Sequence, residues 1–260
     1  MSSLYIKIAD HNCNIIQVSN EFLPFLLERF PLPDGQVDSA DLNLRINHGY
    51  GTPFEDYEVK IIKKEEQVVY LRKDYFIEVD SCFRNATISA YDELALKHAL
   101  MNLYSSFLLH HNWGLLLHSS CVLDGDQAHI FAGHSGAGKS TAARLSTPRE
   151  LLSDEATLLK VTDRSIRIYD SPFRSELETD GYKGHAPLSS IQLLFQAKFN
   201  ERSQVKQSDA FMQLMDKVFY WPYKEDEVVK VLDFLKKIVR IVPVYDLHFQ
   251  KNNTFWELIS

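Results

Sequence analysis

Glycine is scarce in this sequence, with 10 glycines among 260 residues, about 4% where about 7% is usual. Glycine is needed where the backbone turns tightly or comes close to a ligand, so the positions of these few are informative. Five of the ten lie in the 25 residues from Gly114 to Gly138. That stretch is therefore the first place to look for a binding site.

Other absences argue against whole classes of protein. The three cysteines, Cys13, Cys82 and Cys121, form no CxxC pair, which argues against a zinc site or a disulfide framework. No apolar run reaches the ~18 residues of a membrane span, and the first ten residues lack the pattern of a signal peptide. The net charge of -7 disfavours nucleic-acid binding, which depends on Lys and Arg. We expect a cytoplasmic protein with neither nucleic acid nor membrane as a partner.

The remaining composition, 45% hydrophobic and 24% charged residues, is typical of a globular protein with a large core. Short β-branched and aromatic runs predict a β-rich region at residues 1–90. A helix is predicted from Asp92 to His110, because its leucines recur on one helix face. Further helices predicted at Asp209–Tyr220 and Glu225–Val239 give residues 91–260 a helical C-terminal section.

The stretch from Gly133 to Thr141 matches the phosphate-binding pattern G-x-x-x-x-G-K-[ST]. Its glycines let backbone N–H groups point toward a phosphate, Lys139 offers a cation to the β- and γ-phosphates, and Ser140 is the usual Mg²⁺ ligand. A strand-like run precedes the loop and a helix-prone run follows it, as the motif requires. We predict that ATP and Mg²⁺ bind here. The residues predicted to bind the nucleotide are Gly133, His134, Ser135, Gly136, Ala137, Gly138, Lys139, Ser140 and Thr141.

Two acidic residues, Asp154 and Glu155, follow the apolar run that comes next in the chain. A carboxylate at the end of a core strand can hold Mg²⁺ or accept a proton from an attacking hydroxyl. The alternative interpretation is an exposed turn. Beside a phosphate loop the first interpretation is favoured, with Glu155 and Ser140 as metal ligands.

With His118 placed fifteen residues before Gly133, these motifs resemble the catalytic core of the HPr kinase/phosphorylases. The resemblance implies an α/β fold, a P-loop kinase core with a mixed sheet and flanking helices, joined here to the β-rich N-terminal part. It also implies that Asp154 is the general base, that Glu155 assists the metal, and that His118 lines the phosphate site and orients Asp154. The family's acidic pair is usually Asp-Asp, and here it is Asp154-Glu155.

Two later segments, Ser171–Glu176 and Val242–Phe249, look like parts of smaller HPr-kinase-related proteins, some of which phosphorylate a serine of lasso-peptide precursors. In the first segment, Arg174 is a candidate to neutralise the transferring phosphate, and a plain surface arginine is the alternative. His118 has the alternative of an ordinary core or surface histidine. Gly181 and Gly184 are predicted to lie in a mobile loop on the acceptor side.

The function predicted from these residues is an ATP-dependent kinase that phosphorylates a hydroxyl, that of serine, on a peptide or small protein. Two alternatives stay open. One is a nucleotide-binding sensor or assembly protein without phosphotransfer, and the other is a kinase for a small metabolite such as free serine or a sugar. The choice between ATP and GTP and the oligomeric state, including a homo-oligomer, are open as well.

Overall fold

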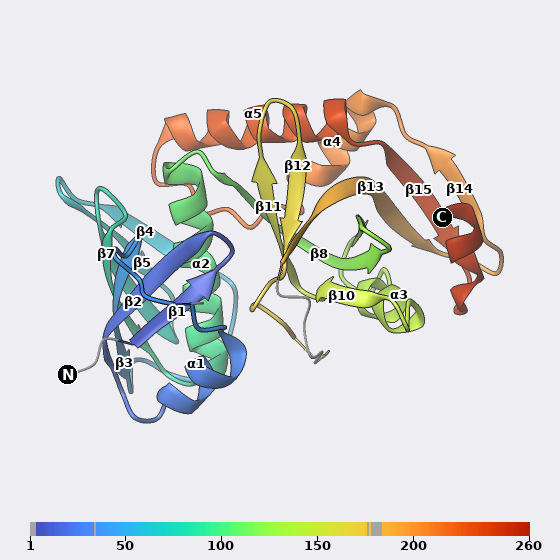
Figure 1. The fold of residues 1–260 in the computed structure, drawn as a ribbon. Helices are drawn as coiled ribbons and strands as arrows, with labels where there is room; N and C mark the ends of the chain where they lie inside the picture. The colour runs from blue at the N-terminus through green and yellow to red at the C-terminus, as the bar shows by residue number, and fades with distance from the viewer. Residues whose placement is uncertain (1–3, 34, 176, 178–183) are drawn as a thin grey trace. The chain divides into compact units, whose positions relative to one another are not determined.

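The computed structural model divides into two compact units (Figure 1). The first unit comprises Met1–His111 and Tyr220–Glu227, and the second comprises Asn112–Phe219 and Val228–Ser260. The sequence predicts a boundary after residue 90, and the long helix that follows this position lies in the first unit. The residues that the structure describes are 4–33, 35–175, 177 and 184–260.

The first unit is built on a sheet that has seven strands within the described residues. In sheet order the strands are β1 (Leu4–Ile8), β2 (His11–Val18), β3 (Leu42–His48), β7 (Asn85–Ala90), β6 (Tyr75–Asp80), β5 (Gln67–Leu71) and β4 (Lys60–Lys63). Burial alternates along β6 and β7, because successive residues of a strand point to opposite faces. The sheet therefore has one apolar face and one polar face.

Helix α2 (Glu93–His110) lies against this sheet (Figure 1) and confirms the predicted helix. Asp92 is its N-cap, and the Asp92 carboxylate accepts a hydrogen bond of 2.9 Å from the backbone N–H of Ala95. Leu96, Leu103 and other residues of α2 are fully buried. The shorter α1 (Leu23–Arg29) completes the helices between Leu4 and His111 that the structure describes.

Within its described residues the second unit holds a sheet of eight strands, five of which close into a barrel. Its strands are β8 (Gly114–Asp124), β9 (Gln127–Ala132), β10 (Glu150–Ser153), β11 (Ala156–Val161), β12 (Ile166–Tyr169), β13 (His185–Gln196), β14 (Glu201–Gln204) and β15 (Val244–Phe249). The first half of β8 pairs with β11 and its second half pairs with β9. β12 and β13 join β11 to β9 and close the ring.

The predicted fold class, an α/β P-loop kinase core with a mixed sheet and flanking helices, is wrong. Strands make up 38% of the chain and helices 25%, and the strands around the loop close on one another. The helix after the loop, α3 (Lys139–Leu145), has 7 residues and is too short to cover a sheet face. Closure depends on β13, because its first residues pair with β12 and its middle residues pair with β9.

Three neighbouring strands of the second unit run parallel, because β13 pairs in parallel with both β9 and β15. Their carboxyl ends, at Ala132, Gln196 and Phe249, therefore meet at one edge of the sheet. Ligands in sheets with parallel strands often bind at this edge. The predicted phosphate loop begins there, directly after Ala132.

A hydrophobic cluster packs against the predicted phosphate loop. It brings together Phe131 of β9, Ala137 of the loop, Ala142 of α3, Phe249 of β15 and Trp256. Trp256 belongs to the short 3-10 helix η1 (Asn253–Leu258), and its indole N–H donates to Ser146 Oγ at 3.0 Å. The end of the chain thereby fixes the end of α3.

The helices α4 (Gln207–Met215) and α5 (Glu225–Ile241) lie where the C-terminal helices were predicted. α4 ends five residues earlier than expected, at Met215 rather than Tyr220. Among the described residues, no helix has the length and apolar character needed to cross a membrane.

Candidate functional site

The predicted phosphate loop forms a tight turn between β9 and α3. Gly136 and Gly138 have φ angles of 80° and 104°, which glycine adopts without the strain of a side chain. The backbone N–H of Ala137 donates to the His134 carbonyl at 3.1 Å. From β13, Gln196 Nε2 donates to the Gly136 carbonyl at 2.7 Å. The loop is therefore held both from within and by the neighbouring parallel strand.

The nine residues of the loop differ in exposure along its length. His134, Ser135 and Gly136 are exposed, and Ala137 is buried in the cluster below. A second group, partly exposed, is Gly133, Gly138, Ser140 and Thr141. The tip of the loop thus faces solvent, and its base is fixed in the core.

Replacing Gly138 with alanine is expected to destabilise this loop. A Cβ atom at Gly138 would lie 2.8 Å from the Phe249 ring. The φ angle of +104° is also a backbone conformation that alanine rarely adopts. Gly136→Ala shares the positive φ but meets no atom within 4 Å. We expect unfolding in denaturant to show a loss of about 1–3 kcal/mol for Gly138→Ala and a smaller loss for Gly136→Ala. Equal losses would show that the Phe249 contact contributes nothing.

Lys139, the first residue of α3, folds back over the loop. Its side chain is largely buried, with the residue 9% exposed, and its Nζ donates to the carbonyls of Gly133 at 3.2 Å and His134 at 3.3 Å. Burial lowers the pKa of the Lys139 amine, and the positive charge of Lys217 lowers this pKa further. Both carbonyls are neutral, so these two hydrogen bonds leave the lysine charge uncompensated.

Three consecutive residues of β8 connect the parts of the predicted site. Ser120 Oγ donates to the Lys139 carbonyl at 3.0 Å, which fixes the start of α3 to the barrel. Ser119 points to the other side, where its Oγ donates to Thr157 Oγ1 at 2.7 Å, and its backbone N–H donates to the Glu155 carbonyl at 3.1 Å. His118 lies on the same side of the strand as Ser120, as the alternation of a strand requires.

His118 lies near enough to Lys139 for the lysine charge to act on its imidazole. Burial lowers the pKa of His118 to about 4, and the charges of Lys139 and Lys217 add to the effect. The imidazole is therefore neutral at pH 7. Its ring stacks on Phe219, with centroids 5.3 Å apart and planes at 9°. A packed ring near two cations fits a residue that lines a phosphate site, and it equally fits the alternative of an ordinary core histidine.

We expect His118 to make the protein less stable in acid. Its pKa is about 4 in the folded chain against an ordinary value of 6.5, so between these values the unfolded chain binds a proton that the folded chain does not. Its contribution to stability is present above pH 6.5 and is lost as the pH falls to 4. Across this range, the free energy of unfolding in denaturant should depend less on pH for His118→Asn than for the parent. The difference between the two slopes should correspond to less than one proton, because solvent partly screens the ring. Parallel curves for both proteins would contradict this.

Asp154 lies at the end of β10 and is 3% exposed, so the alternative of an exposed turn is wrong for this residue. One carboxylate oxygen, Oδ1, accepts the backbone N–H of Ser175 at 2.9 Å, and Oδ2 accepts that of Leu177 at 2.9 Å. Next to it, the hydroxyl groups of Ser153 and Thr157 are hydrogen-bonded at 2.5 Å. Asp154 therefore fixes the backbone at Ser175 and Leu177, just after the Ser171–Pro172–Phe173–Arg174 stretch.

Arg174 is not a plain surface residue, and its guanidinium group already has hydrogen-bond partners within the chain. Its side chain is 10% exposed, and Nη2 lies 2.5 Å from Asp170 Oδ1 and 3.1 Å from the Leu151 carbonyl. Burial raises the pKa of Asp170 to about 6, against the opposing charge of Arg174. In this arrangement, Nη2 of Arg174 anchors the segment to β10 and to Asp170.

The family model described as "SynChlorMet cassette protein ScmC" matches residues 82–260, more than half of the chain. The chain belongs to the ScmC family. No curated protein matches it. The ScmC match includes the loop, His118, the acidic pair and Arg174, so all the predicted site residues lie in the part that defines the family. The family's printed description states no activity.

The predicted Mg²⁺ ligands, Ser140 and Glu155, have the hard oxygen atoms that Mg²⁺ prefers. Ser140 lies in the first turn of α3 and Glu155 is partly buried after β10. In the part of the chain that the structure describes, no three His, Cys, Asp or Glu side chains form a group able to hold a metal ion. A Mg²⁺ ion bound with nucleotide phosphates needs only one or two protein ligands, so the donor set fits such an ion.

Sequence reasoning missed residues that come to the loop from elsewhere in the ScmC chain. Gln196 and Lys217 belong to no recognisable sequence motif. Their positions follow only from the pairing of the strand or segment in which each lies. Phe249, whose ring would meet a side chain at Gly138, lies in a segment noted for its resemblance but without a predicted role. Gly184 accepts the backbone N–H of Asp170 at 3.2 Å through its carbonyl, whereas Glu176 and Gly181 lie outside the described residues.

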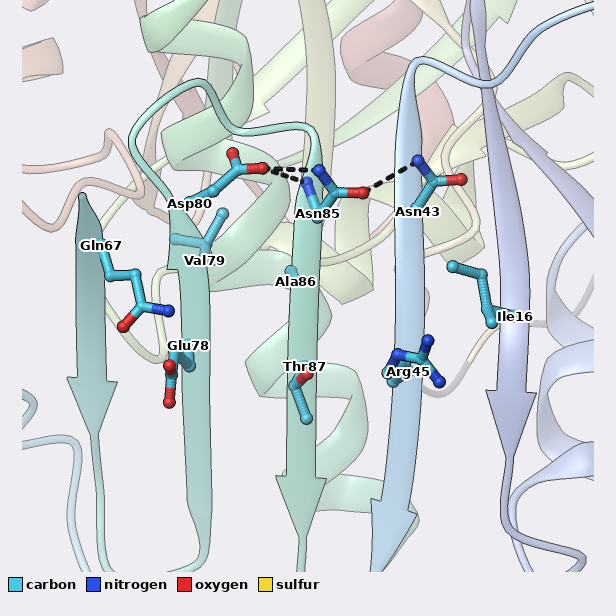
Figure 2. A pocket seen from close by; sticks show the side chains of 10 residues that line it. All are labelled: Ile16, Asn43, Arg45, Gln67, Glu78, Val79, Asp80, Asn85, Ala86 and Thr87. Carbon is cyan, nitrogen blue, oxygen red and sulfur yellow. Dashed lines mark hydrogen bonds between the residues drawn. The ribbon is translucent and has the colours of Figure 1, made fainter.

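A separate hollow of about 320 Å³ lies on the polar face of the first unit's sheet (Figure 2). Asn85 Nδ2 donates to Asp80 Oδ2 at 2.7 Å, and Asn43 Nδ2 donates to Asn85 Oδ1 at 3.1 Å. Arg45 and Glu78 lie further along the same strands (Figure 2). These side chains form a hydrogen-bonded sheet surface, and we assign no phosphate chemistry to it.

Proposed function

We propose that this chain is an ATP-dependent kinase that transfers the γ-phosphate to a serine hydroxyl of a peptide or small protein. The observation that carries the proposal is the Lys139 amine, which lies over the loop on the carbonyls of Gly133 and His134. Phosphate oxygens are charged and accept stronger hydrogen bonds from a lysine than carbonyls do. A bound nucleotide would replace two weak partners of this cation with strong ones.

The proposed reaction is a direct transfer. The acceptor oxygen forms a bond to the γ-phosphorus, the bond from that phosphorus to the β–γ bridging oxygen breaks, and ADP leaves. The acceptor proton passes to a carboxylate oxygen of Asp154. Lys139 binds the β- and γ-phosphates, and neutral His118 packs beside it. A bound Mg²⁺ supplies charge neutralisation at the phosphate oxygens, with Ser140 and Glu155 as its protein ligands.

The acceptor must reach a carboxylate that already has partners. Both oxygens of Asp154 accept backbone N–H groups, from Ser175 and Leu177. An acceptor hydroxyl that donates to Asp154 either uses a remaining lone pair or replaces one of these groups. The backbone at Ser175 and Leu177 is therefore the part of the chain whose hydrogen bonds we expect to change when an acceptor binds.

The experiment is a screen for transfer of labelled γ-phosphate from ATP. The family is named for a cassette, so any serine-containing peptide encoded in that cassette is the first acceptor to test, followed by other serine peptides, free serine and sugars. Label on a peptide serine supports the proposal, and label on free serine or a sugar would indicate a metabolite kinase instead. Parent-like transfer by both Lys139→Ala and Asp154→Asn would rule the assignment out.

One observation favours the second candidate, a nucleotide-binding sensor or assembly protein. In this structure both carboxylate oxygens of Asp154 accept hydrogen bonds from the chain's own backbone. The site is thereby linked to the segment of Ser175 and Leu177 even when no acceptor is bound. For such a protein, ATP binds and changes hydrogen exchange at Ser175 and Leu177, and no hydroxyl is phosphorylated. Transfer to any acceptor at a rate that depends on Asp154 would exclude this candidate.

A further inference from the structure

A short segment after α4 runs beside β8 in the second unit. Leu117 and Val218 form an antiparallel bridge. The backbone N–H of His118 donates to the Lys217 carbonyl at 2.6 Å, and the backbone N–H of Phe219 donates to the Leu116 carbonyl at 2.9 Å. The segment Lys217–Phe219 is therefore fixed, by backbone bonds and by the stacked rings of His118 and Phe219, next to the strand that carries His118.

This pairing places Lys217 opposite His118 on β8, and Ser120, two residues further along the same strand, donates to the Lys139 carbonyl at 3.0 Å. The Lys217 side chain is 13% exposed, and its positive charge acts on both the Lys139 amine and the His118 imidazole. The acid at hydrogen-bond distance from it is its neighbour Asp216, at 2.6 Å, and that side chain is 71% exposed. An ion pair with so exposed a partner compensates the charge only weakly.

Two lysines held close together repel each other unless an anion lies between them. The Lys139 amine donates hydrogen bonds to neutral carbonyls. The imidazole of His118 is uncharged at pH 7. Among the described residues, the hydrogen-bond partners of the two lysines thus compensate less than their positive charge. A group with two negative charges and several acceptor oxygens would match it, and the terminal phosphate of a nucleoside triphosphate is such a group.

We propose that Lys217 is a second cation of the phosphate site and binds the terminal phosphoryl group of a nucleoside triphosphate together with Lys139. The inference rests on the proposed function, because it assigns the γ-phosphate to one end of the same site. Lys217 then distinguishes a triphosphate from a diphosphate. Lys139, which serves both the β- and γ-phosphates, holds either nucleotide.

The test compares the affinities of the full chain for ATP and for ADP, each with Mg²⁺, by calorimetry. For Lys217→Gln, we expect the affinity for ATP to fall about tenfold or more, as for the loss of one charged hydrogen bond, and the affinity for ADP to change little. Lys217→Arg keeps the cation and should retain most of the preference for ATP. Lys139→Gln should weaken both nucleotides.

Lys236→Gln is the matched control, because Lys236 is an exposed lysine of the same unit on α5, and it should keep both affinities. If the parent binds ATP and Lys217→Gln keeps the parent's ratio of ATP to ADP affinity, the inference about Lys217 is wrong and the proposed function stands. If the parent binds no ATP, the proposed function fails and the inference fails with it. A purely structural lysine would weaken both nucleotides equally, which would also contradict the inference.

Discussion

Replacing Lys139 with alanine is expected to reduce the affinity for ATP by about 10- to 100-fold, as for a charged hydrogen bond of about 1.5–3 kcal/mol. Phosphoryl transfer should fall further, by at least about 10²-fold, because charge on the transferring group grows in the transition state. The reason lies in the position of the amine, which is largely buried over the loop and bonded only weakly, to the carbonyls of Gly133 and His134. Calorimetry and single-turnover transfer measure the two effects.

The stability of this variant separates a binding role from a structural one. Lys139 is buried and close to the charge of Lys217, so its removal relieves desolvation and repulsion. We expect the free energy of unfolding of Lys139→Ala to stay within about 1 kcal/mol of the parent. The exposed Lys236 on α5 provides the control variant Lys236→Ala. A Lys139→Ala protein that is well folded and binds ATP as the parent does would contradict the assigned role.

Replacing Asp154 with asparagine is expected to lower transfer by about 10²–10⁴-fold, the usual contribution of a general base. The affinity for ATP should change little, because the proposed contact of Asp154 is with the acceptor and not with the nucleotide. Asparagine is similar in size to aspartate but does not accept the acceptor's proton. The measurement is single-turnover transfer at saturating ATP.

The same change also disturbs the segment at Ser175 and Leu177, because the amide offers one acceptor oxygen where the carboxylate offers two. An amide N–H group then faces one of the two backbone donors, at a cost of about 1–3 kcal/mol. Hydrogen exchange at the Ser175 and Leu177 amides reports this effect separately from transfer. Asp233→Asn, at an exposed position on α5, is the control and should leave both readouts unchanged. Full transfer with faster exchange would show that Asp154 has only a structural role.

Local features of the site were predictable from the sequence. The loop from Gly133 to Thr141 lies between a strand and a helix, as its motif requires, since glycine, lysine and hydroxyl residues at fixed spacing serve one local turn. α2 was predictable because Leu96, Leu100 and Leu103 recur at helical spacing, although every residue from Ala99 to Leu109 is buried in the structure. The burial of Asp154 was favoured by the apolar run before it and by the nearby loop.

The closed barrel was not predictable from local pattern. Closure depends on β13, whose sequence includes Pro187 and Ser189-Ser190 and lacks the clear alternation of a strand. Its pairing with β9 joins residues about sixty positions apart, and such pairing depends on the whole fold rather than on neighbouring residues. A glycine-rich loop after a strand is equally compatible with an open α/β sheet and with a barrel, so the motif could not decide between them.

The residues that approach the loop from a distance were missed for the same reason. Gln196 reaches the Gly136 carbonyl because β13 lies parallel to β9, and Lys217 lies beside His118 because a segment after α4 pairs with β8. Neither residue has a neighbour in sequence that suggests a role. The local sequence thus predicted the loop and the elements on either side of it, and only the fold revealed that Gln196 donates to the loop and that Lys217 pairs with β8.

The measurement that tests the central claim most directly is single-turnover transfer of labelled γ-phosphate from ATP to serine-containing peptides. Parent protein and Lys139→Ala are compared at equal folded concentration. Our account predicts label on a peptide serine with the parent, and at least about 10²-fold less with Lys139→Ala. Parent protein that binds ATP and phosphorylates no hydroxyl, or equal transfer by the two proteins, would contradict it.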